Sequence, residues 1–252
     1  MRLSRIIKSY TTPRGYLRRW VIRHTNRTVQ AGPFAGMRYV DKAWGSAYVP
    51  KLLGTYESEL YPVIEQVAPE DYDTLIDIGV AEGYFAVGLA LRSHARVIGY
   101  ECNDRARSLA EGLAKKNGVQ ENVELRGDCT PAELETTLGK ANRPFLLCDV
   151  DGYETTLLDP QHTPSLGKTA MLVELVLRGW PGVTAEFFRR FGESHHIELI
   201  WQNPRTAADF PLKNRWMRVF PNRDLRHMVD ELRPCEQSWM WLTPKTAVAQ
   251  AA

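Results

Sequence analysis

The chain has 252 residues and a mass of 28.7 kDa, which is enough for one large or two small domains with a sizeable apolar core. Its 44% hydrophobic and 25% charged residues, with 18 Gly and 15 Pro, are typical of a soluble globular protein and exclude a disordered or collagen-like chain. No apolar stretch reaches the about 20 residues that a transmembrane helix needs, so we expect no membrane span.

The net charge of +2 hides an uneven distribution along the chain. Residues 1–40 hold nine Lys or Arg and no acid, which leaves the remainder with a net charge of −7. A basic segment of this kind can contact phosphates, anionic lipid or the acidic surface of its own domain. It also resembles an organellar transit peptide in composition, but a solvated or self-docked extension is the simplest interpretation.

The first 70 residues carry only weak structural patterns. Residues 1–30 show a helix-like pattern that includes Leu17 and Val21. Thr55 can cap a helix that reaches residue 67, and Pro62 should kink or restart this helix. We therefore expect a basic extension and lid over residues 1–54, a main domain over residues 55–245 and a flexible tail over residues 246–252.

From residue 73 onward, short apolar runs alternate with helical patterns. The expected strands cover residues 74–78, 96–100, 122–126, 145–150, 170–176, 197–201 and 238–242. The expected helices cover residues 82–91, 106–117 and 222–232, and a further helix starts at the capping box Thr130-Pro131-Ala132-Glu133. This alternation predicts an α/β fold with a mostly parallel sheet and helices on both faces.

Ligands of such sheets bind beyond the carboxyl ends of the strands, so these ends are where a site is expected. The first strand is followed by a small-residue turn, Asp77-Ile78-Gly79-Val80-Ala81-Glu82-Gly83-Tyr84-Phe85. The turn is not the dinucleotide fingerprint GxGxxG, because Ala81 and Tyr84 stand where glycine is required. The acid before the first glycine instead suits a nucleoside that carries a cationic amino group.

Acidic residues also follow the next two strands. Glu101 stands 22 positions after Gly79, close to the offset at which an acid binds the hydroxyl groups of a ribose. After the third strand, Gly127-Asp128-Cys129 offers an acid that could accept a hydrogen bond from an adenine amine.

Together these features resemble class I S-adenosylmethionine-dependent methyltransferases. The fourth strand end, Leu147-Cys148-Asp149-Val150-Asp151-Gly152-Tyr153-Glu154, and the later Leu172-Val173-Glu174-Leu175 are similar to the FkbM-type subgroup. The resemblance extends from about residue 73 to residue 176, and Asp151 departs from it because glutamate is expected there. It implies a Rossmann-like, seven-stranded sheet with an antiparallel last strand, here preceded by an N-terminal helical extension.

The resemblance also implies roles for individual residues. S-adenosylmethionine would be the cofactor, and the implied reaction is O-methylation of a hydroxyl group on a small molecule, sugar or lipid-like acceptor. The expected catalytic residues are Asp149, Asp151 and Glu154. The expected cofactor-binding residues are Asp77, Gly79, Val80, Ala81, Glu82, Gly83, Tyr84, Phe85, Glu101, Cys102, Asp128, Cys129 and Asp149.

Several alternatives stay open. Asp149, Asp151, Glu154 and Glu174 offer oxygen ligands suited to Mg²⁺, but no spacing requires a metal and we predict none. His195 and His196 are further candidates for a general base, although ordinary surface or packed histidines are the simpler interpretation.

The acceptor and the compartment also have alternatives. The basic N-terminal segment could bind RNA or DNA as the methyl acceptor, and the same fold could serve as a non-catalytic binding module. The four cysteines lack the spacing of a zinc knuckle or a CxxC motif, which favours a reducing compartment, and we expect a cytoplasmic protein.

Overall fold

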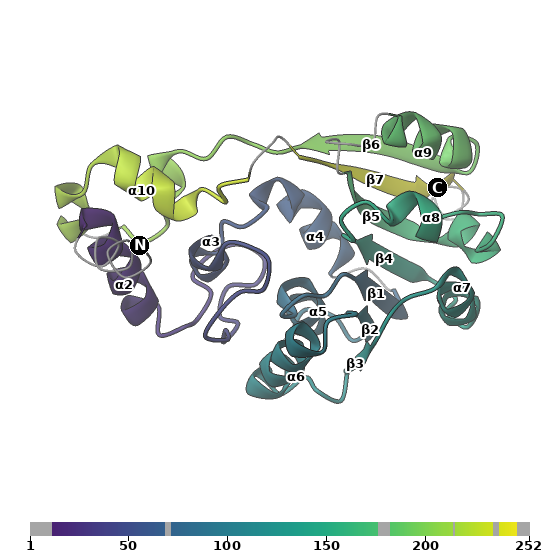
Figure 1. Cartoon of the computed structure of the whole chain (residues 1–252), viewed down its shortest axis with the longest axis horizontal. Coiled ribbons are helices and arrows are strands. Elements are labelled where there is room, and N and C mark those ends of the chain that lie inside the picture. Colours follow the sequence, from purple (N-terminus) through teal and green to yellow (C-terminus); the bar gives the residue numbers. More distant parts are fainter. Residues whose placement is uncertain (1–11, 69–71, 176–181, 214, 234–236, 246–252) are drawn as a thin grey trace, which may run out of the picture. The chain divides into compact units, whose positions relative to one another are not determined.

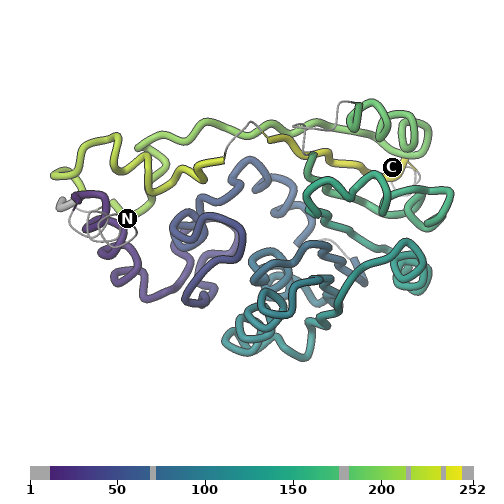
Figure 2. The backbone as a smooth tube through the Cα atoms, in the orientation of Figure 1, coloured from purple at the N-terminus to yellow at the C-terminus, as the bar shows by residue number. Residues whose placement is uncertain are grey.

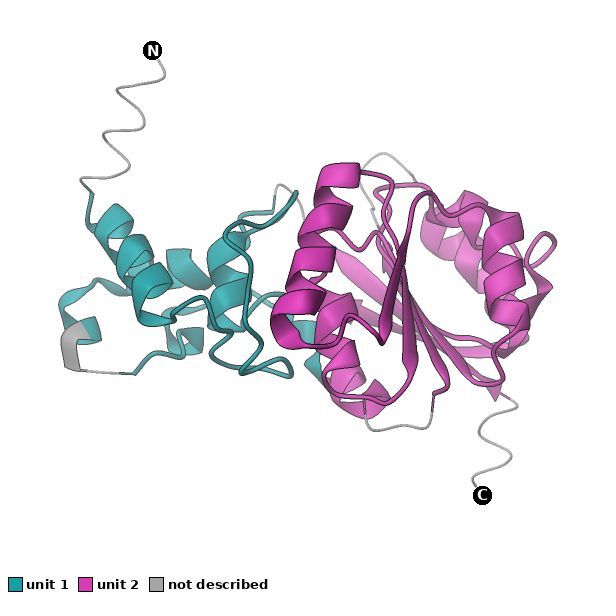
Figure 3. Cartoon of the chain, turned by 90° about the horizontal axis from the view of Figure 1, so that it is seen from below, with its two compact units in different colours: residues 1–61, 203–233 teal, residues 62–202, 234–252 magenta. Residues whose placement is uncertain are grey.

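The computed structural model describes residues 12–68, 72–175, 182–213, 215–233 and 237–245. The chain divides into two compact units (Figure 3). Unit 1 comprises residues 1–61 and 203–233, and unit 2 comprises residues 62–202 and 234–252. Residues 203–233, which the sequence analysis assigned to the main domain, thus share a unit with the N-terminal segment. The expected tail over residues 246–252 lies outside the described residues.

Unit 2 is built on a seven-stranded sheet in the order β3-β2-β1-β4-β5-β7-β6 (Figure 1). The strands are β1 Thr74–Ile78, β2 Arg96–Tyr100, β3 Val123–Arg126, β4 Pro144–Cys148, β5 Ala170–Leu175, β6 His195–Trp201 and β7 Ser238–Pro244. β1 to β5 are parallel, whereas β7 is antiparallel to both β5 and β6. The expected Rossmann-like sheet with an antiparallel last strand is therefore confirmed.

Helices cover both faces of this sheet (Figure 1). They are α4 Tyr61–Val67, α5 Tyr84–Ala90, α6 Asp104–Asn117, α7 Pro131–Gly139, α8 Glu154–Leu157, the 3₁₀ turn η2 Pro164–Lys168 and α9 Val183–Phe191. Every residue of β4 and of β5 is buried, as expected for strands with helices on both sides. Side chains from α7, α8 and α9 join those of the sheet in one apolar core.

Local sequence signals explain several helix boundaries. Asn103 caps the start of α6, and Gly118 ends it in the left-handed region. The helix expected up to residue 67 is split into the 3₁₀ turn η1 Ser58–Leu60 and α4, so that Pro62 lies in the first turn of α4, where its missing N–H is harmless. The helix expected over residues 222–232 is shorter and ends at Val229.

Unit 1 joins two segments that are far apart in the sequence. Its elements are α2 Pro13–His24, α3 Tyr48–Leu53, η1, the 3₁₀ turns η3 Ala207–Asp209 and η4 Arg215–Val219, and α10 Asn222–Val229. α10 contacts both α2 and α3, and the tube in Figure 2 shows the two segments side by side. Leu17 and Val21 of α2 pack with Met228 and Val229 of α10 in a small core. No helix in the described residues is long and apolar enough to cross a membrane.

Candidate functional site

The strand order of unit 2 reverses direction between β1 and β4, and the loops after these two strands flank this point. In open α/β sheets a crevice for ligands forms there, beyond the carboxyl ends of the strands. Asp77 is buried near the end of β1, in register with Gly99 of β2 and Leu147 of β4. The first predicted site residue therefore lies in the middle of the sheet, at the reversal point.

The turn from Gly79 to Gly83 leaves β1 and starts α5. Gly79 has a φ of +90°, and a Cβ atom there would lie 1.8 Å from the carbonyl oxygen of Asp149. Gly83 has a φ of +96°, and its Cβ would lie 3.1 Å from the Cβ of Ala110 in α6. The close approach of Asp149 and the positive φ require glycine at position 79, whereas at position 83 the positive φ favours glycine and the contact with Ala110 is tight. Val80, Glu82 and Tyr84 are buried, and Phe85 is partly buried beside Tyr84.

Glu101 holds this turn from the neighbouring strand end. Its Oε2 accepts a hydrogen bond of 2.8 Å from the backbone N–H of Ala81, and its Oε1 accepts one of 2.8 Å from the N–H of Asn103. The exposed Cys102 lies between Glu101 and Asn103 in the sequence, and its thiol contacts Oε1 of Glu101 at 3.8 Å. Each carboxylate oxygen has two lone pairs, so Glu101 retains capacity to accept from a ligand.

The third predicted position follows β3. Asp128 is exposed and Cys129 is partly buried. Burial raises the pKa of the Cys129 thiol to about 12, so this thiol stays neutral at physiological pH. Cys129 can therefore contribute packing and a weak donor to a ligand, but no thiolate.

The loop after β4 carries the three expected catalytic carboxylates, and the structure separates them into two environments. β4 ends at Cys148, two residues earlier than expected, and the chain then turns through Asp151 and Gly152, which both have positive φ. Glu154 is buried, and its Oε1 accepts hydrogen bonds from the N–H groups of Val150 and Gly152 at 3.3 and 3.0 Å. Glu154 thus holds the loop together from inside, whereas Asp149 is partly exposed and Asp151 is exposed.

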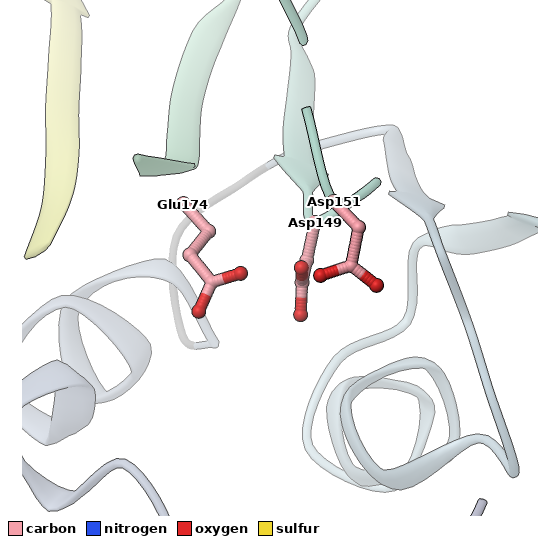
Figure 4. A group of neighbouring side chains, drawn as sticks. All are labelled: Asp149, Asp151 and Glu174. Carbon is pink, nitrogen blue, oxygen red and sulfur yellow. The ribbon is translucent and has the colours of Figure 1, made fainter. Parts of the chain in front are cut away.

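A carboxylate from the next strand joins the two aspartates. Glu174 of β5 is buried, and one oxygen each of Asp149, Asp151 and Glu174 lie within 4.8 Å of one another. Figure 4 shows the three side chains together. The sequence predicts Glu174 as a possible oxygen ligand of Mg²⁺ but not as one of the site residues. The relevant signal is that β4 and β5 are parallel neighbours, whose carboxyl ends meet at one edge.

These three carboxylates can contribute to a site in three ways. As hard oxygen donors they could hold a divalent cation of the Mg²⁺ or Ca²⁺ type. Their negative charge also favours a positively charged group of an organic ligand, and each carboxylate can accept a proton.

The two histidines differ in their surroundings, as expected for neighbours in a strand. His195 is buried, and its ring nitrogens hydrogen-bond to Ser194 Oγ at 2.7 Å and to the carbonyl of Thr169 at 3.0 Å. His196 is exposed. Burial lowers the pKa of His195, which keeps its ring neutral at physiological pH and is consistent with a packing role.

Comparison with known proteins shows that solved structures resemble this chain in fold. No protein-family model matches the chain, and no curated protein matches it. Among solved structures, the O-methyltransferase from Bacillus cereus in complex with SAH is 15% identical, with a TM-score of 0.47 over 73% of this chain and 79% of that one. A SAM-dependent O-methyltransferase from Thermotoga maritima is 16% identical, with a TM-score of 0.47 over 75% and 65% of the two chains.

A third structure, precorrin 8w decarboxylase from Methanobacterium thermoautotrophicum, is 15% identical, with a TM-score of 0.48 over 75% and 89% of the two chains. At these identities and TM-scores no activity can be transferred to this chain. A function is therefore inferred from the residues of this chain alone.

Proposed function

We propose that this protein is an S-adenosylmethionine-dependent methyltransferase that methylates a hydroxyl group on a small molecule, sugar or lipid-like acceptor. The observation that carries the proposal is the 2.8 Å hydrogen bond from the N–H of Ala81 to Glu101. It joins the glycine turn after β1 to the acid after β2, beside the point where the strand order reverses. The two motifs with which the sequence resembles these methyltransferases thus form one connected structure.

The residues at this edge suit the chemistry of the cofactor. S-adenosylmethionine has ribose hydroxyls and an adenine amine, which donate hydrogen bonds, and it carries a positive sulfonium. Glu101 and Asp128 offer carboxylates that accept such hydrogen bonds. Asp149, Asp151 and Glu174 form a group of negative charge that favours a cation nearby. Acceptors and negative charge are therefore available for each of these three groups.

When bound, the cofactor supplies a methyl group that is already activated by its sulfonium. The protein's contribution is then to align the acceptor oxygen with the methyl carbon and to exclude water. Asp149 or Asp151 would accept the proton that the acceptor hydroxyl gives up when its oxygen takes the methyl group in place of the sulfur, and S-adenosylhomocysteine would leave as the neutral thioether. Glu154 is already bonded to two amides of the loop, so its role in our proposal is to position these aspartates.

The choice of oxygen as the methylated atom depends on the motif after β4. The sequence from Leu147 to Glu154 resembles the FkbM-type subgroup and lacks the Asn/Asp-Pro-Pro-aromatic turn typical of enzymes that methylate the amines of nucleic-acid bases. This comparison favours a hydroxyl acceptor over a base amine.

The first experiment is calorimetric titration of S-adenosylmethionine and S-adenosylhomocysteine into the wild type and Glu101→Ala. Loss of hydrogen bonds to a charged carboxylate should weaken binding by about tenfold or more. Glu101→Gln keeps one oxygen that can accept from the Ala81 amide, so its affinity for the cofactor should lie between those of the wild type and Glu101→Ala. Glu111→Ala, a change of the same kind at an exposed position in α6, should bind like the wild type.

Two further measurements complete this test. Thermal melts of each variant establish that any loss of binding occurs in a folded protein. Incubation with hydroxylated acceptors should then release S-adenosylhomocysteine. A folded wild type that binds neither compound would contradict the proposal.

A further inference from the structure

The two compact units have opposite charge. Unit 1 contains 18 Lys and Arg but only seven Asp and Glu, whereas unit 2 contains 14 Lys and Arg and 23 Asp and Glu. Their net charges are therefore +11 and −9, which the total of +2 conceals. A surface with so large an excess of one sign attracts ligands of the opposite charge over several ångströms.

The acids of unit 1 leave the exposed cations largely uncompensated. Four of the seven, Glu57, Glu59, Asp224 and Glu231, are buried. The three glutamates form ion pairs with Arg205 and Arg233. These pairs lie inside the unit, so they do not lower the positive charge of its surface.

The other acids of unit 1 also have partners. Asp224 of α10 pairs with Arg14 of α2 at 2.7 Å, and Asp41 pairs with Arg27 at 3.0 Å. Asp209 caps η3 by accepting from the N–H and hydroxyl of Thr206. Within the described residues, five exposed arginines of this unit pair with no acid: Arg18 and Arg23 of α2, Arg218 of η4, and Arg223 and Arg226 of α10.

Unit 1 also has exposed apolar side chains. Tyr16 is 60% exposed, Val219 is 72% exposed and Leu232 is 61% exposed, all in unit 1. The sequence before α2 is also basic and apolar, because residues 1–11 contain three cations, four large aliphatic side chains and no acid. A surface that combines arginines with exposed aliphatic and aromatic groups fits the boundary between lipid headgroups and acyl chains.

We propose that unit 1 binds the anionic surface of a lipid bilayer. The arginines of α2 and α10 pair with headgroup phosphates, and the exposed apolar side chains enter the interfacial layer. A nucleic acid also carries phosphates, but its bases bind to proteins by stacking on rings, and Val219 and Leu232 have none. The aliphatic side chains therefore favour lipid. This binding does not depend on the proposed methyl transfer.

The test measures co-sedimentation of the full chain with vesicles of phosphatidylcholine alone and with added phosphatidylglycerol. We expect binding only to the anionic vesicles. Arg18→Ala combined with Arg23→Ala should weaken it by about 25-fold, which corresponds to about 1 kcal/mol for each arginine. Lys115→Ala combined with Lys140→Ala removes the same charge at exposed positions of unit 2 and should leave vesicle binding unchanged.

A second variant separates lipid from other polyanions. Val219→Ser keeps all charges and should weaken vesicle binding several-fold, because less apolar surface enters the interface. Binding of a labelled RNA oligonucleotide serves as the comparison. Equal binding to both kinds of vesicle would overturn the proposal. A second outcome would also overturn it: the chain binds RNA more tightly than vesicles, the arginine variant no longer binds RNA, and Val219→Ser binds RNA like the wild type.

Discussion

At position 79 the backbone leaves β1 with a φ of +90°, close against the loop that follows β4. Any side chain there would meet the carbonyl oxygen of Asp149, which would lie 1.8 Å from a Cβ atom. Neither strand end can move away easily, because Asp149 donates its N–H to the carbonyl of Ile78 at 2.9 Å. The glycine thus determines how closely the two site loops approach.

We predict that Gly79→Ala destabilises the protein by about 3 kcal/mol or more and abolishes binding of S-adenosylmethionine. The control is Gly112→Ala in α6, where a Cβ atom meets nothing within 4 Å. This change should be neutral or should stabilise by about 0.5–1 kcal/mol, because alanine favours a helix. Urea unfolding of both variants measures the difference, and equal stabilities would contradict the prediction.

Glu154 affects the site through the loop residues that it holds in place. Its carboxylate accepts from the N–H groups of Val150 and Gly152, on either side of Asp151. Removal of this acceptor leaves two amides without their partner and frees the loop that carries the aspartates.

We therefore predict that Glu154→Ala lowers the turnover number by about a hundredfold, as expected for misplaced catalytic groups. The dissociation constant for S-adenosylmethionine should change much less, because Glu101 and the glycine turn are untouched. Glu154→Gln retains an acceptor oxygen and should recover much of the turnover. A direct proton-accepting role would instead leave Glu154→Gln as inactive as Glu154→Ala.

At the scale of elements, α7 shows how a few residues determine a helix start. Thr130 accepts from the N–H of Glu133 through its side chain, Glu133 reaches back to the N–H of Thr130, and Pro131 occupies the first helical position. All of these groups are adjacent in sequence, which is why the helix start was predicted correctly. The end of β4 depends on contacts with another strand, and the prediction there was two residues too long.

We predict that Thr130→Ala lowers the free energy of unfolding by about 1 kcal/mol through loss of the cap. Thr136→Ala serves as the matched control, since Thr136 is exposed on the same helix and its hydroxyl bonds only to the carbonyl of Ala132. That change should be close to neutral. Thermal or denaturant unfolding of the pair checks the prediction, and a similar loss in both variants would argue against the capping role.

At the scale of the whole molecule, a buried ionic network joins segments that lie far apart in the sequence. Arg205 pairs with Glu59 at 2.6 Å and with Glu231 at 2.8 Å, and all three side chains are at most 4% exposed. Glu231 also accepts from the N–H of Glu57 at 2.9 Å. The network thus fastens residues 203–233 to the N-terminal segment within unit 1.

We predict that Arg205→Ala destabilises the protein by about 3–5 kcal/mol, because the buried Glu59 loses its cation and the buried Glu231 keeps only its pair with Arg233. Arg92→Ala removes a partly exposed arginine from its pair with the exposed Glu65 and should cost about 1 kcal/mol or less. Hydrogen exchange should show faster opening of α2 and α10 in the Arg205 variant, with β1 and β4 less affected. Uniform loosening of both units would contradict a role confined to unit 1.

Local patterns in the sequence predicted the alternation of strands and helices, both ends of β1 and of β2, and the edge at which acids and glycines gather. These features follow from local periodicity and capping, and from the rule that parallel strands end at one edge. The contacts of Glu154 with its own loop, and the position of Glu174 beside Asp149 and Asp151, are seen only in the folded structure. The same is true of residues 203–233, which share a unit with the N-terminal segment. Each of these depends on contacts between groups distant in sequence, which periodicity does not encode.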